Sequence, residues 1–144
     1  MKVTSILKAK GSDVITVRSE TPVEAVVRAL RAKGIGAVVV SDDGASVAGM
    51  IAERDVVHAL ALYGGRVLHL HASDIMVRRV VTCRPDDSVT HVMGQMTAHR
   101  VRHLPVVDGG RLRGIVSIGD VVKHRLDELE TEANVLREAF IARR

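Results

Sequence analysis

Residues 23–30, VEAVVRAL, and residues 89–96, VTHVMGQM, decide how this 144-residue chain folds. Each segment has apolar residues at positions i, i+3, i+4 and i+7, the spacing that gathers side chains on one face of a helix. An offset of 66 residues relates the two segments, and it also relates Thr16 to Thr82. A chain that repeats at a fixed offset is built from copies of one structural unit. We therefore predict two equivalent halves, each with a helix packed against a core.

The first of these helices carries signals at both ends. Thr21, Pro22 and Glu24 predict a capping box with proline at the first helical position. Gly34 is suited to end the helix. In the second half Asp87 occupies the position of Thr21, so we expect the second helix to begin in the same way.

A β-rich run and a turn follow each predicted helix. Asp42-Asp43-Gly44 and Asp108-Gly109-Gly110 predict the turns of two hairpins. The hairpin strands are predicted at residues 37–40, 47–51, 104–107 and 112–116. Polar helix starts follow at Glu53 and Gly119, so each half reads strand, helix, strand, strand, helix.

Composition and periodicity divide the chain into four parts. Between the halves lies a stretch with a Gly-Gly pair and no clear period, which predicts a linker, and a short helix at residues 72–76 follows it. The predicted parts are a first domain (1–63), the linker (64–71), a second domain (72–124) and a C-terminal amphipathic helix (125–144). A lone half of about 60 residues would be marginally stable, so the halves should pack together with a ligand cleft between them.

The charge and aromatic content limit the choice of partners. The chain has 21 basic residues and a net charge of +4, but the basic residues are scattered rather than clustered. Aromatic residues make up only 1% of the chain, so aromatic stacking platforms are not expected. Nucleic-acid binding stays a less favoured alternative, because no module that reads a groove is recognisable.

Cysteine, histidine and hydropathy patterns point to a cytoplasmic protein without a metal. Cys83 is the one cysteine and lies in an apolar stretch, which favours a buried structural thiol. No apolar run approaches the ~20 residues that span a bilayer, and residues 1–11 lack a secretory apolar region. His58, His69 and His71 have no carboxylate or cysteine cluster at a ligand interval, so we expect no metal site.

Several segments together resemble the CBS domain, which is named after cystathionine β-synthase. The segments are SDIM at 73–76, VT at 81–82, HRVRHLPVVD at 99–108 and GIVSIGD at 114–120. The whole chain resembles free-standing bacterial proteins with a pair of such domains, and the likeness covers nearly all of residues 1–140. It implies an α+β, α/β sandwich-like fold of two β-α-β-β-α repeats in a pseudo-two-fold pair, with a long C-terminal helix.

The segment at 114–120 is similar to the nucleotide motif of that family. Ser117 would end a strand and Asp120 would open the next helix, so the hydroxyl and the carboxylate converge where they can bind a ribose diol. Both residue types are also strong N-caps, and a capping role is compatible with ribose binding. In the first half Asp55 is retained but Ala52 replaces the hydroxyl residue, which would weaken that site by about 0.5–1.5 kcal/mol. We therefore rank the site at Ser117 and Asp120 first.

The resemblance also implies contacts to the rest of an adenosine nucleotide. It places the base beside apolar strand residues and the phosphates beside basic ones. The implied base contacts are Val81, Thr82, Leu104 and Pro105, with Thr16 and Val38 in the first half; the implied phosphate contacts are Arg102, His103 and Arg54. The first-half counterparts of Arg102 and His103 are Gly36 and Ala37, so we expect the two halves to be functionally unequal.

The function implied is that of a non-catalytic sensor. AMP, ADP, ATP or NAD would bind in the cleft, change the angle between the halves and alter what the protein presents to a separate protein partner. No cofactor is required, and the spacing of nucleophiles and carboxylates indicates no enzyme. The alternative is a ligand-independent homodimeric scaffold.

The resemblance also implies a homodimer. Apolar residues follow one side of the C-terminal helix, which is a candidate dimer contact, although the helix could instead fold back onto its own domain. These residues are Val122, Leu126, Leu129, Ala133, Leu136 and Phe140.

Overall fold

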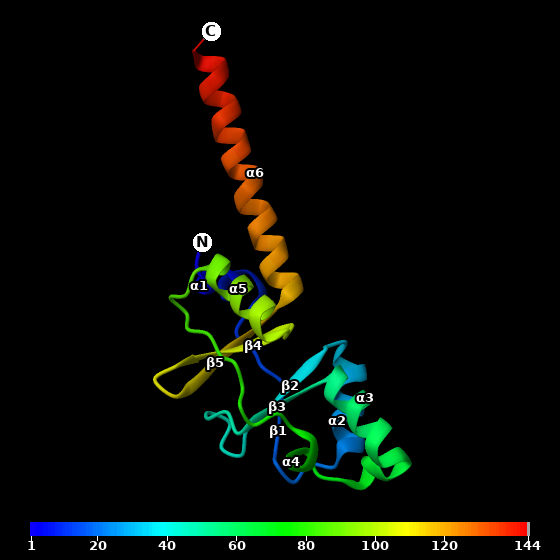
Figure 1. The fold of residues 1–144 in the computed structure, drawn as a ribbon. Coiled ribbons are helices and arrows are strands. Elements are labelled where there is room, and N and C mark those ends of the chain that lie inside the picture. The colour runs from blue at the N-terminus through cyan, green and yellow to red at the C-terminus, as the bar shows by residue number, and fades with distance from the viewer. Residues whose placement is uncertain (144) are drawn as a thin grey trace.

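The predicted apolar stripes face two separate cores in the computed structural model, which describes residues 1–143. In the first core Val26 and Leu30 pack against strand residues such as Ile51. In the second core Val92 and Met96 pack against Leu104 and its neighbours. The predicted helix faces are therefore confirmed, and the two halves lie one above the other in Figure 1.

The first half contains a three-stranded sheet covered by two helices. Its elements are β1 (Thr16–Val17), α2 (Val23–Lys33), β2 (Ala37–Val40), β3 (Gly49–Ala52) and α3 (Glu53–Tyr63). β2 lies in the centre, parallel to β1 and antiparallel to β3. All four residues of β2 are buried, which explains its continuous apolar sequence AVVV.

The second half repeats this arrangement with a longer hairpin. Its elements are α5 (Val89–His99), β4 (His103–Asp108), β5 (Arg111–Ser117) and α6 (Ile118–Ala142). Helix α4 (Ala72–Ile75), which precedes them in the chain, packs on the first core through Ala72 and Ile75. β4 and β5 pair antiparallel, and Cys83 forms a parallel bridge to Val106 where the first half has β1. The predicted helix and hairpin are thus present in both halves, whereas the predicted first strand of the second half is reduced to the single bridge at Cys83.

Helix α1 (Val3–Lys10) packs on the second core although it begins the chain. Val3 and Ile6 are fully buried among Val89, Val92 and Leu104. Gly114 of β5 allows this contact, since a Cβ on Gly114 would lie 2.7 Å from Leu7 Cδ2. This helix was not predicted from the sequence.

The predicted capping box at Thr21 is wrong. The Thr21 hydroxyl accepts a hydrogen bond from the Arg18 amide at 3.0 Å, so it closes the turn before the helix, and Pro22 is the N-cap of α2. Asp87 likewise accepts from the Arg84 amide, and Ser88 caps α5 by accepting from the His91 amide. Proline has no side-chain acceptor for a helix amide. The turn at residues 18–21 and the packing of α2 therefore fix where α2 begins. Gly34 ends α2 in the left-handed conformation, as predicted.

The connection between the halves is ordered rather than irregular. Gly64–His69 form the 3₁₀ helix η1, and Val67 is 1% exposed in a small core with Val23 and Ala59. A 3₁₀ helix has three residues per turn, which explains why this stretch shows neither the period of an α-helix nor that of a strand. Helix α4 follows, close to the prediction of residues 72–76.

The C-terminal helix α6 does not fold back onto the body. Its first turns contact α1 and α5, and the remainder extends away from both halves (Figure 1). Val121 is its one buried residue. No helix within residues 1–143 is both long and apolar enough to cross a bilayer.

Candidate functional site

A cavity of about 320 Å³ lies between the two halves. Both halves supply its walls, through the start of α3 and the strand before it on one side and the segments before and after α5 on the other. The lining residues are Gly36, Met50, Ala52, Glu53, Arg54, Asp55, Val77, Arg79, Val80, Val81, Arg100, Val101, Arg102 and His103. Its size falls in the range of small-ligand sites, which begins at ~300 Å³.

Asp55 presents a carboxylate at the first-half wall of this cavity. It is the third residue of α3, and its Oδ2 accepts a hydrogen bond from the Ala52 amide at 2.8 Å. This bond holds the carboxylate at the N-terminal end of the helix, where the positive end of the helix dipole stabilises an anion. Ala52 lacks the hydroxyl that would complete a capping box.

Four arginines line the same cavity and come from both halves. They are Arg54, Arg79, Arg100 and Arg102. Two acidic side chains, Glu53 and Asp55, share the lining, so the arginines outnumber the carboxylates. Guanidinium groups bind phosphate oxygens with paired donors, and such a cluster favours a ligand that carries phosphate.

Arg54 and Arg100 connect the halves at the rim of the cavity. Arg54 Nη1 donates a hydrogen bond to the Arg100 carbonyl at 3.0 Å. Arg100 ends α5 with a φ of 54°, and among the residues described here it is the single non-glycine residue with positive φ. A side chain in this conformation costs about 1–2 kcal/mol. The first-half counterpart, Gly34, has a φ of 61° and avoids this cost.

The rest of the wall is apolar. Met50 of β3 pairs with Val77 through two backbone hydrogen bonds of 3.0 and 2.9 Å, which join the strand to the segment that enters the second half. Val80 and Val81 continue this segment along the cavity. An apolar wall opposite charged groups suits a flat base with a polar tail.

The equivalent position in the second half is closed by a lysine. Asp120 and Ser117 form a full capping box, in which Ser117 Oγ accepts from the Asp120 amide and Asp120 Oδ2 accepts from the Ser117 amide. Lys10 of α1 donates to the same Oδ2 at 2.7 Å and to the Ile115 carbonyl at 3.1 Å. Burial opposes ionisation of Asp120, but the bonds from Lys10 and Ser117 outweigh it and hold the pKa of this carboxyl below its usual value.

His103 lies between the two positions. A Cβ on Gly36 would lie 2.9 Å from the His103 ring and 3.1 Å from Glu53 Oε1, so glycine is needed for the halves to approach here. Burial, together with the charge of Lys10, lowers the pKa of His103 against the opposing effects of Glu53 and Asp120. Burial therefore favours the neutral form of the imidazole.

The structure brings some of the predicted site residues together and separates others. Val81, Arg102, His103, Arg54 and Asp55 all line the cavity. Ser117 and Asp120 do not line it, and neither do Thr16 and Thr82, which have exposed side chains. Val38, Leu104 and Pro105 are buried in strands of the two cores.

Sequence reasoning missed Arg79, Arg100 and Lys10. Comparison at the offset of 66 could have indicated the first two, since it aligns Arg79 with Asp13 and Arg100 with Gly34. Lys10 carries no such signal, because its partner is more than one hundred residues away in the chain.

The Cys83 thiol and the arrangement of possible metal ligands limit the chemistry of the protein. Burial, with a smaller contribution from Asp87, raises the pKa of the Cys83 thiol to about 12, so this thiol is inert at neutral pH. Within residues 1–143 no group of three or more His, Cys, Asp and Glu side chains is placed to hold a metal ion.

Comparison with known proteins identifies the repeated unit. The family model of the CBS domain matches the chain twice, at residues 7–62 and 72–127. This chain belongs to the CBS-domain family. Its architecture, with two CBS repeats and the long helix α6, is that of CBS-domain pair proteins, which are regulatory modules.

Solved structures of CBS pairs have the same fold. The CBS-domain containing protein ATU1752 from Agrobacterium tumefaciens is 44% identical, with a TM-score of 0.83 over 87% of this chain and 99% of that one. The CBS domain pair of protein MJ0100, solved in complex with 5′-methylthioadenosine and S-adenosyl-L-methionine, is 26% identical, with a TM-score of 0.78 over 89% and 98%. Adenosine-type ligands thus bind a similar CBS pair.

Two of the similar curated proteins are longer than this chain. A 33.4 kDa protein in a ribosomal RNA operon of Thermofilum pendens is 37% identical over 99 residues, which cover 69% of this chain and 32% of that protein. The mitochondrial CBS domain-containing protein CBSX3 of Arabidopsis thaliana is 30% identical over 90% of this chain and 67% of its own length. The chain therefore spans about a third to two thirds of these relatives.

Proposed function

We propose that this CBS pair is a non-catalytic sensor that binds an adenosine nucleotide in the cavity lined by Asp55. One observation carries the proposal: a carboxylate at a helix N-terminus, an apolar wall and four arginines line a single cavity between the halves. Asp55 would accept hydrogen bonds from the ribose hydroxyls, and the arginines would bind the phosphates. This reverses the order of the two sites expected from the sequence.

The charge of the lining favours nucleotides over uncharged or cationic adenosine compounds. Four guanidinium groups against two carboxylates attract an anion, and each added phosphate brings further acceptor oxygens. AMP, ADP, ATP and NAD carry phosphate, whereas S-adenosylmethionine carries none. We therefore expect the order ATP and ADP above AMP, with S-adenosylmethionine weakest.

Binding would be coupled to the arrangement of the halves. Asp55 and Arg54 belong to the first domain, whereas Arg79, Arg100 and Arg102 belong to the second, so a ligand that contacts both groups selects one relative position. The hydrogen bond from Arg54 to the Arg100 carbonyl joins the two domains, so a change in their relative position would alter it. A separate protein in the cytoplasm would bind differently to the two arrangements of the domains.

Calorimetric titration of ATP, ADP, AMP, NAD and S-adenosylmethionine into the purified protein tests the proposal. Asp55→Asn removes the charge but keeps an acceptor for the Ala52 amide, and Asp120→Asn is the matched control. Because hydrogen bonds to charged groups contribute about 1.5–3 kcal/mol, Asp55→Asn should weaken nucleotide binding about 10- to 100-fold. Asp120→Asn should change the nucleotide affinity by less than about threefold, because Asp120 lies outside the cavity. This corresponds to a difference in binding free energy below ~0.7 kcal/mol.

Two results would overturn this assignment. Equal losses in both variants, with unchanged circular dichroism and melting temperature, would remove the distinction between the sites. Absence of heat with every nucleotide from the folded wild-type protein would favour the ligand-independent scaffold. Arg79→Gln is a second variant for the case that Asp55→Asn unfolds, because Arg79 is exposed and lines the same cavity.

A further inference from the structure

Helix α6 extends well beyond the body of the protein. All side chains from Leu129 to Arg143 are exposed, and at about 1.5 Å per residue this part of the helix is roughly 20 Å long. Helices of this length are marginal in water without packing of an apolar face. Val135 and Leu136 are 59% and 71% exposed, so much of the apolar surface on the outer part of α6 is open to solvent.

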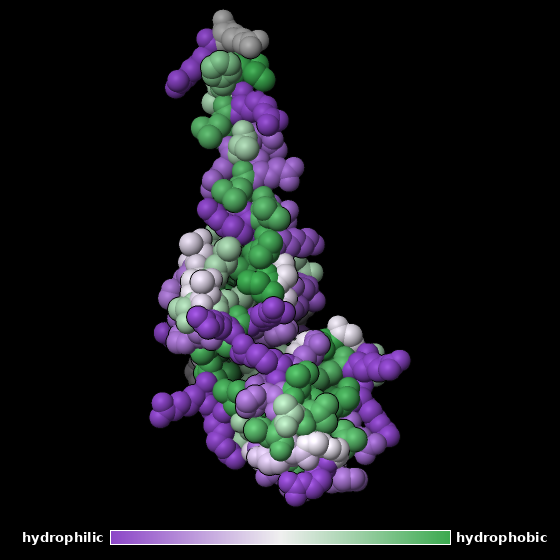
Figure 2. All heavy atoms as spheres, turned by 45° about the vertical axis from the view of Figure 1, so that its right-hand side comes forward, coloured by the Kyte–Doolittle hydropathy of each residue, from purple (hydrophilic) through white to green (hydrophobic). Residues whose placement is uncertain are grey.

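An apolar seam follows one side of the helix. It consists of Val122, Leu126, Leu129, Ala133, Leu136 and Phe140. The intervals alternate between four and three residues, which is the heptad spacing of a coiled coil with Leu126, Ala133 and Phe140 at a and the others at d. Leu126 is 60% exposed and Leu136 is 71% exposed. Figure 2 shows the apolar side chains running along α6 away from the body.

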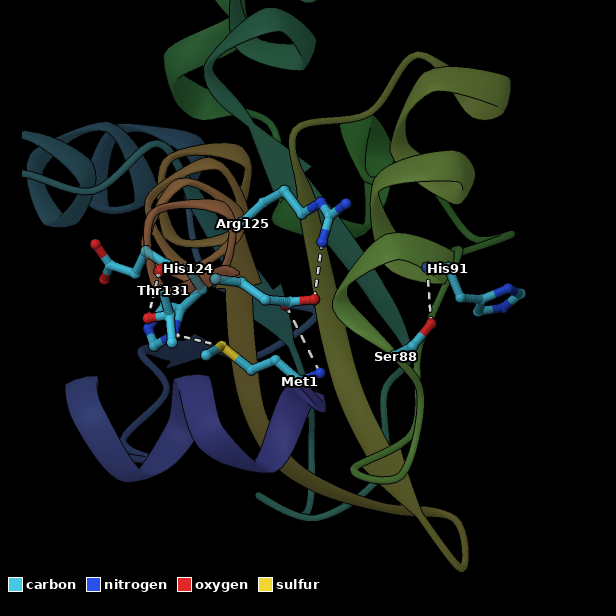
Figure 3. A network of polar contacts seen from close by, with 8 residues as sticks. Met1, Ser88, His91, His124, Arg125 and Thr131 are labelled. Atoms are coloured by element: carbon cyan, nitrogen blue, oxygen red, sulfur yellow. Dashed lines mark hydrogen bonds and ion pairs between the residues drawn. The ribbon is translucent and has the colours of Figure 1, made fainter. Parts of the chain in front are cut away.

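Contacts at the base of α6 fix the direction in which this seam points. Glu128 Oε1 accepts from Arg125 Nη1 at 2.8 Å, and Glu128 Oε2 lies 3.6 Å from the Met1 amino group, so Glu128 faces the body. Figure 3 labels Arg125 and Met1, the two residues that it contacts. His124, one helical turn before Glu128, places its Nδ1 3.3 Å from the Met1 sulfur. Val122, Leu126 and Leu129 lie on the other side of the helix and are exposed.

The charges beside the seam select the partner and its direction. The e positions hold Lys123, Glu130 and Arg137, and the g positions hold Arg125 and Glu132. In a parallel pair each g residue faces the e residue five positions later on the other helix, so Arg125 faces Glu130 and Glu132 faces Arg137. Both pairs have opposite charges.

In an antiparallel pair with the whole seam overlapped, residues of like charge face each other beside the seam. In that arrangement e residues face e residues and g residues face g residues. Glu130 would then face Glu130, Glu132 would face Glu132, and Lys123 would face Arg137. A shift of one heptad restores opposite charges, but it moves one end of the seam, either Val122 with Leu126 or Leu136 with Phe140, beyond the end of the opposite seam.

We infer that α6 pairs with α6 of a second copy of this chain as a parallel two-stranded coiled coil. The seam supplies the apolar layers, and the pairs of Glu132 with Arg137 flank it on both sides. Arg125 also bonds Glu128 on its own helix, and its guanidinium has five N–H donors to serve both carboxylates. The arrangement places the two nucleotide cavities at the same end of the dimer.

Charge variants test both the surface and the direction. Sedimentation equilibrium of the full chain should show a dimer, and Leu136→Asp should shift it to monomer while the two CBS domains stay folded. Arg137→Glu should weaken the dimer at least about fivefold, because it places two like charges face to face in each pair. Glu132→Arg combined with Arg137→Glu should restore it. In the antiparallel arrangement Arg137→Glu would instead strengthen the dimer, since Lys123 would gain an opposite charge.

Crosslinking gives a readout that is independent of affinity. Ala133→Cys places a thiol at an a position, which faces itself only in a parallel pair, and mild oxidation should yield a covalent dimer. Glu138→Cys on the outer face is the matched control, and Cys83 does not interfere because it is 2% exposed. A wild-type monomer at all concentrations, or a dimer that Leu136→Asp leaves intact, would overturn the inference. Neither result would bear on nucleotide binding.

Discussion

The two CBS domains contain the same junction between a strand and a helix but surround it differently. In the second domain the capping box of Ser117 and Asp120 is complete, and Lys10 pairs with the carboxylate at 2.7 Å. In the first domain the hydroxyl is missing at Ala52, and Asp55 lines a cavity. The domain with the more complete motif therefore has its polar groups paired within the protein, while the domain with Ala52 keeps a carboxylate at the cavity.

The helix before each hairpin shows a second contrast. Both helices end in the left-handed conformation, at Gly34 in the first domain and at Arg100 in the second. A Cβ on Gly34 would meet no atom within 4 Å, so glycine there serves the backbone alone. Arg100 adopts the same conformation at a cost in conformational energy. That cost is explained if the Arg100 side chain binds a ligand in the cavity that it lines.

Replacement of Arg100 by glycine should have the largest effect on this contrast. Loss of one guanidinium from the cavity should weaken ATP binding about tenfold, equivalent to ~1.4 kcal/mol. The free energy of unfolding should stay equal or rise by up to about 1 kcal/mol, because glycine adopts this conformation without strain. Calorimetry and urea denaturation measure the two quantities.

The matched control for Arg100→Gly is Gly34→Ala. It should lower the free energy of unfolding by about 1 kcal/mol and leave ATP binding unchanged. If Arg100→Gly destabilised the protein and left affinity unchanged, Arg100 would have a structural role only.

Removal of Lys10 should make the two domains more alike. In Lys10→Met the Asp120 carboxylate loses its cation, so we expect a second, weaker equivalent of nucleotide per chain in calorimetry. The pKa of Asp120 should rise, because the bond from Lys10 is a main cause of its lowered value. A carboxyl with a lowered pKa stabilises the fold above its unfolded pKa and loses that contribution as the pH falls, so Lys10→Met should reduce the loss of stability in acid.

Carbon-detected NMR titration of the Asp120 carboxyl follows this change directly. Lys10→Arg is the control and should keep both the lowered pKa and the stoichiometry of one nucleotide. A stoichiometry that stays at one in Lys10→Met would show that Lys10 is not what closes the second position.

Restoration of the missing hydroxyl should give the smallest effect. Ala52→Ser would complete the capping box that Asp55 already half forms, and N-cap serine contributes about 1 kcal/mol to stability. Nucleotide affinity should rise only about two- to fivefold, because one neutral hydrogen bond contributes on the order of 0.5–1 kcal/mol. Thermal melting and calorimetry measure the two effects.

Ser117→Ala is the mirror experiment in the second domain. It should lower stability by about 1 kcal/mol, with little effect on nucleotide affinity, because Ser117 caps α6 and does not line the cavity. A large loss of affinity in Ser117→Ala would return the site to the second domain.

Local patterns in the sequence were sufficient for most of the fold. The apolar stripes, the hairpin turns and Gly34 each act within a few residues, so their spacing carries the information. The predicted cap at Thr21 failed because proline and the preceding turn, not a side-chain acceptor, set the start of α2. Helix α1 was missed since its partners in the second core lie about eighty residues away, at Pro85 and Asp87 among others.

The candidate site was predictable only in part. The family motif indicated Asp55, Arg54, Arg102 and His103, which the structure brings to one cavity. It could not show that Asp120 would be paired with Lys10, nor that Val38 and Leu104 would be wholly buried. Both depend on how distant segments pack.

By itself the sequence determined two copies of one CBS unit, the elements of each copy and the heptad seam of α6, because periodicity and turn chemistry are properties of neighbouring residues. Only the tertiary structure decided which copy has the cavity, because that depends on where α1 lies. The contact of Lys10 with Asp120 forms when α1 packs on the second core, and no equivalent lysine reaches Asp55 among the described residues. An almost symmetric sequence thereby folds into a protein with one closed and one open position.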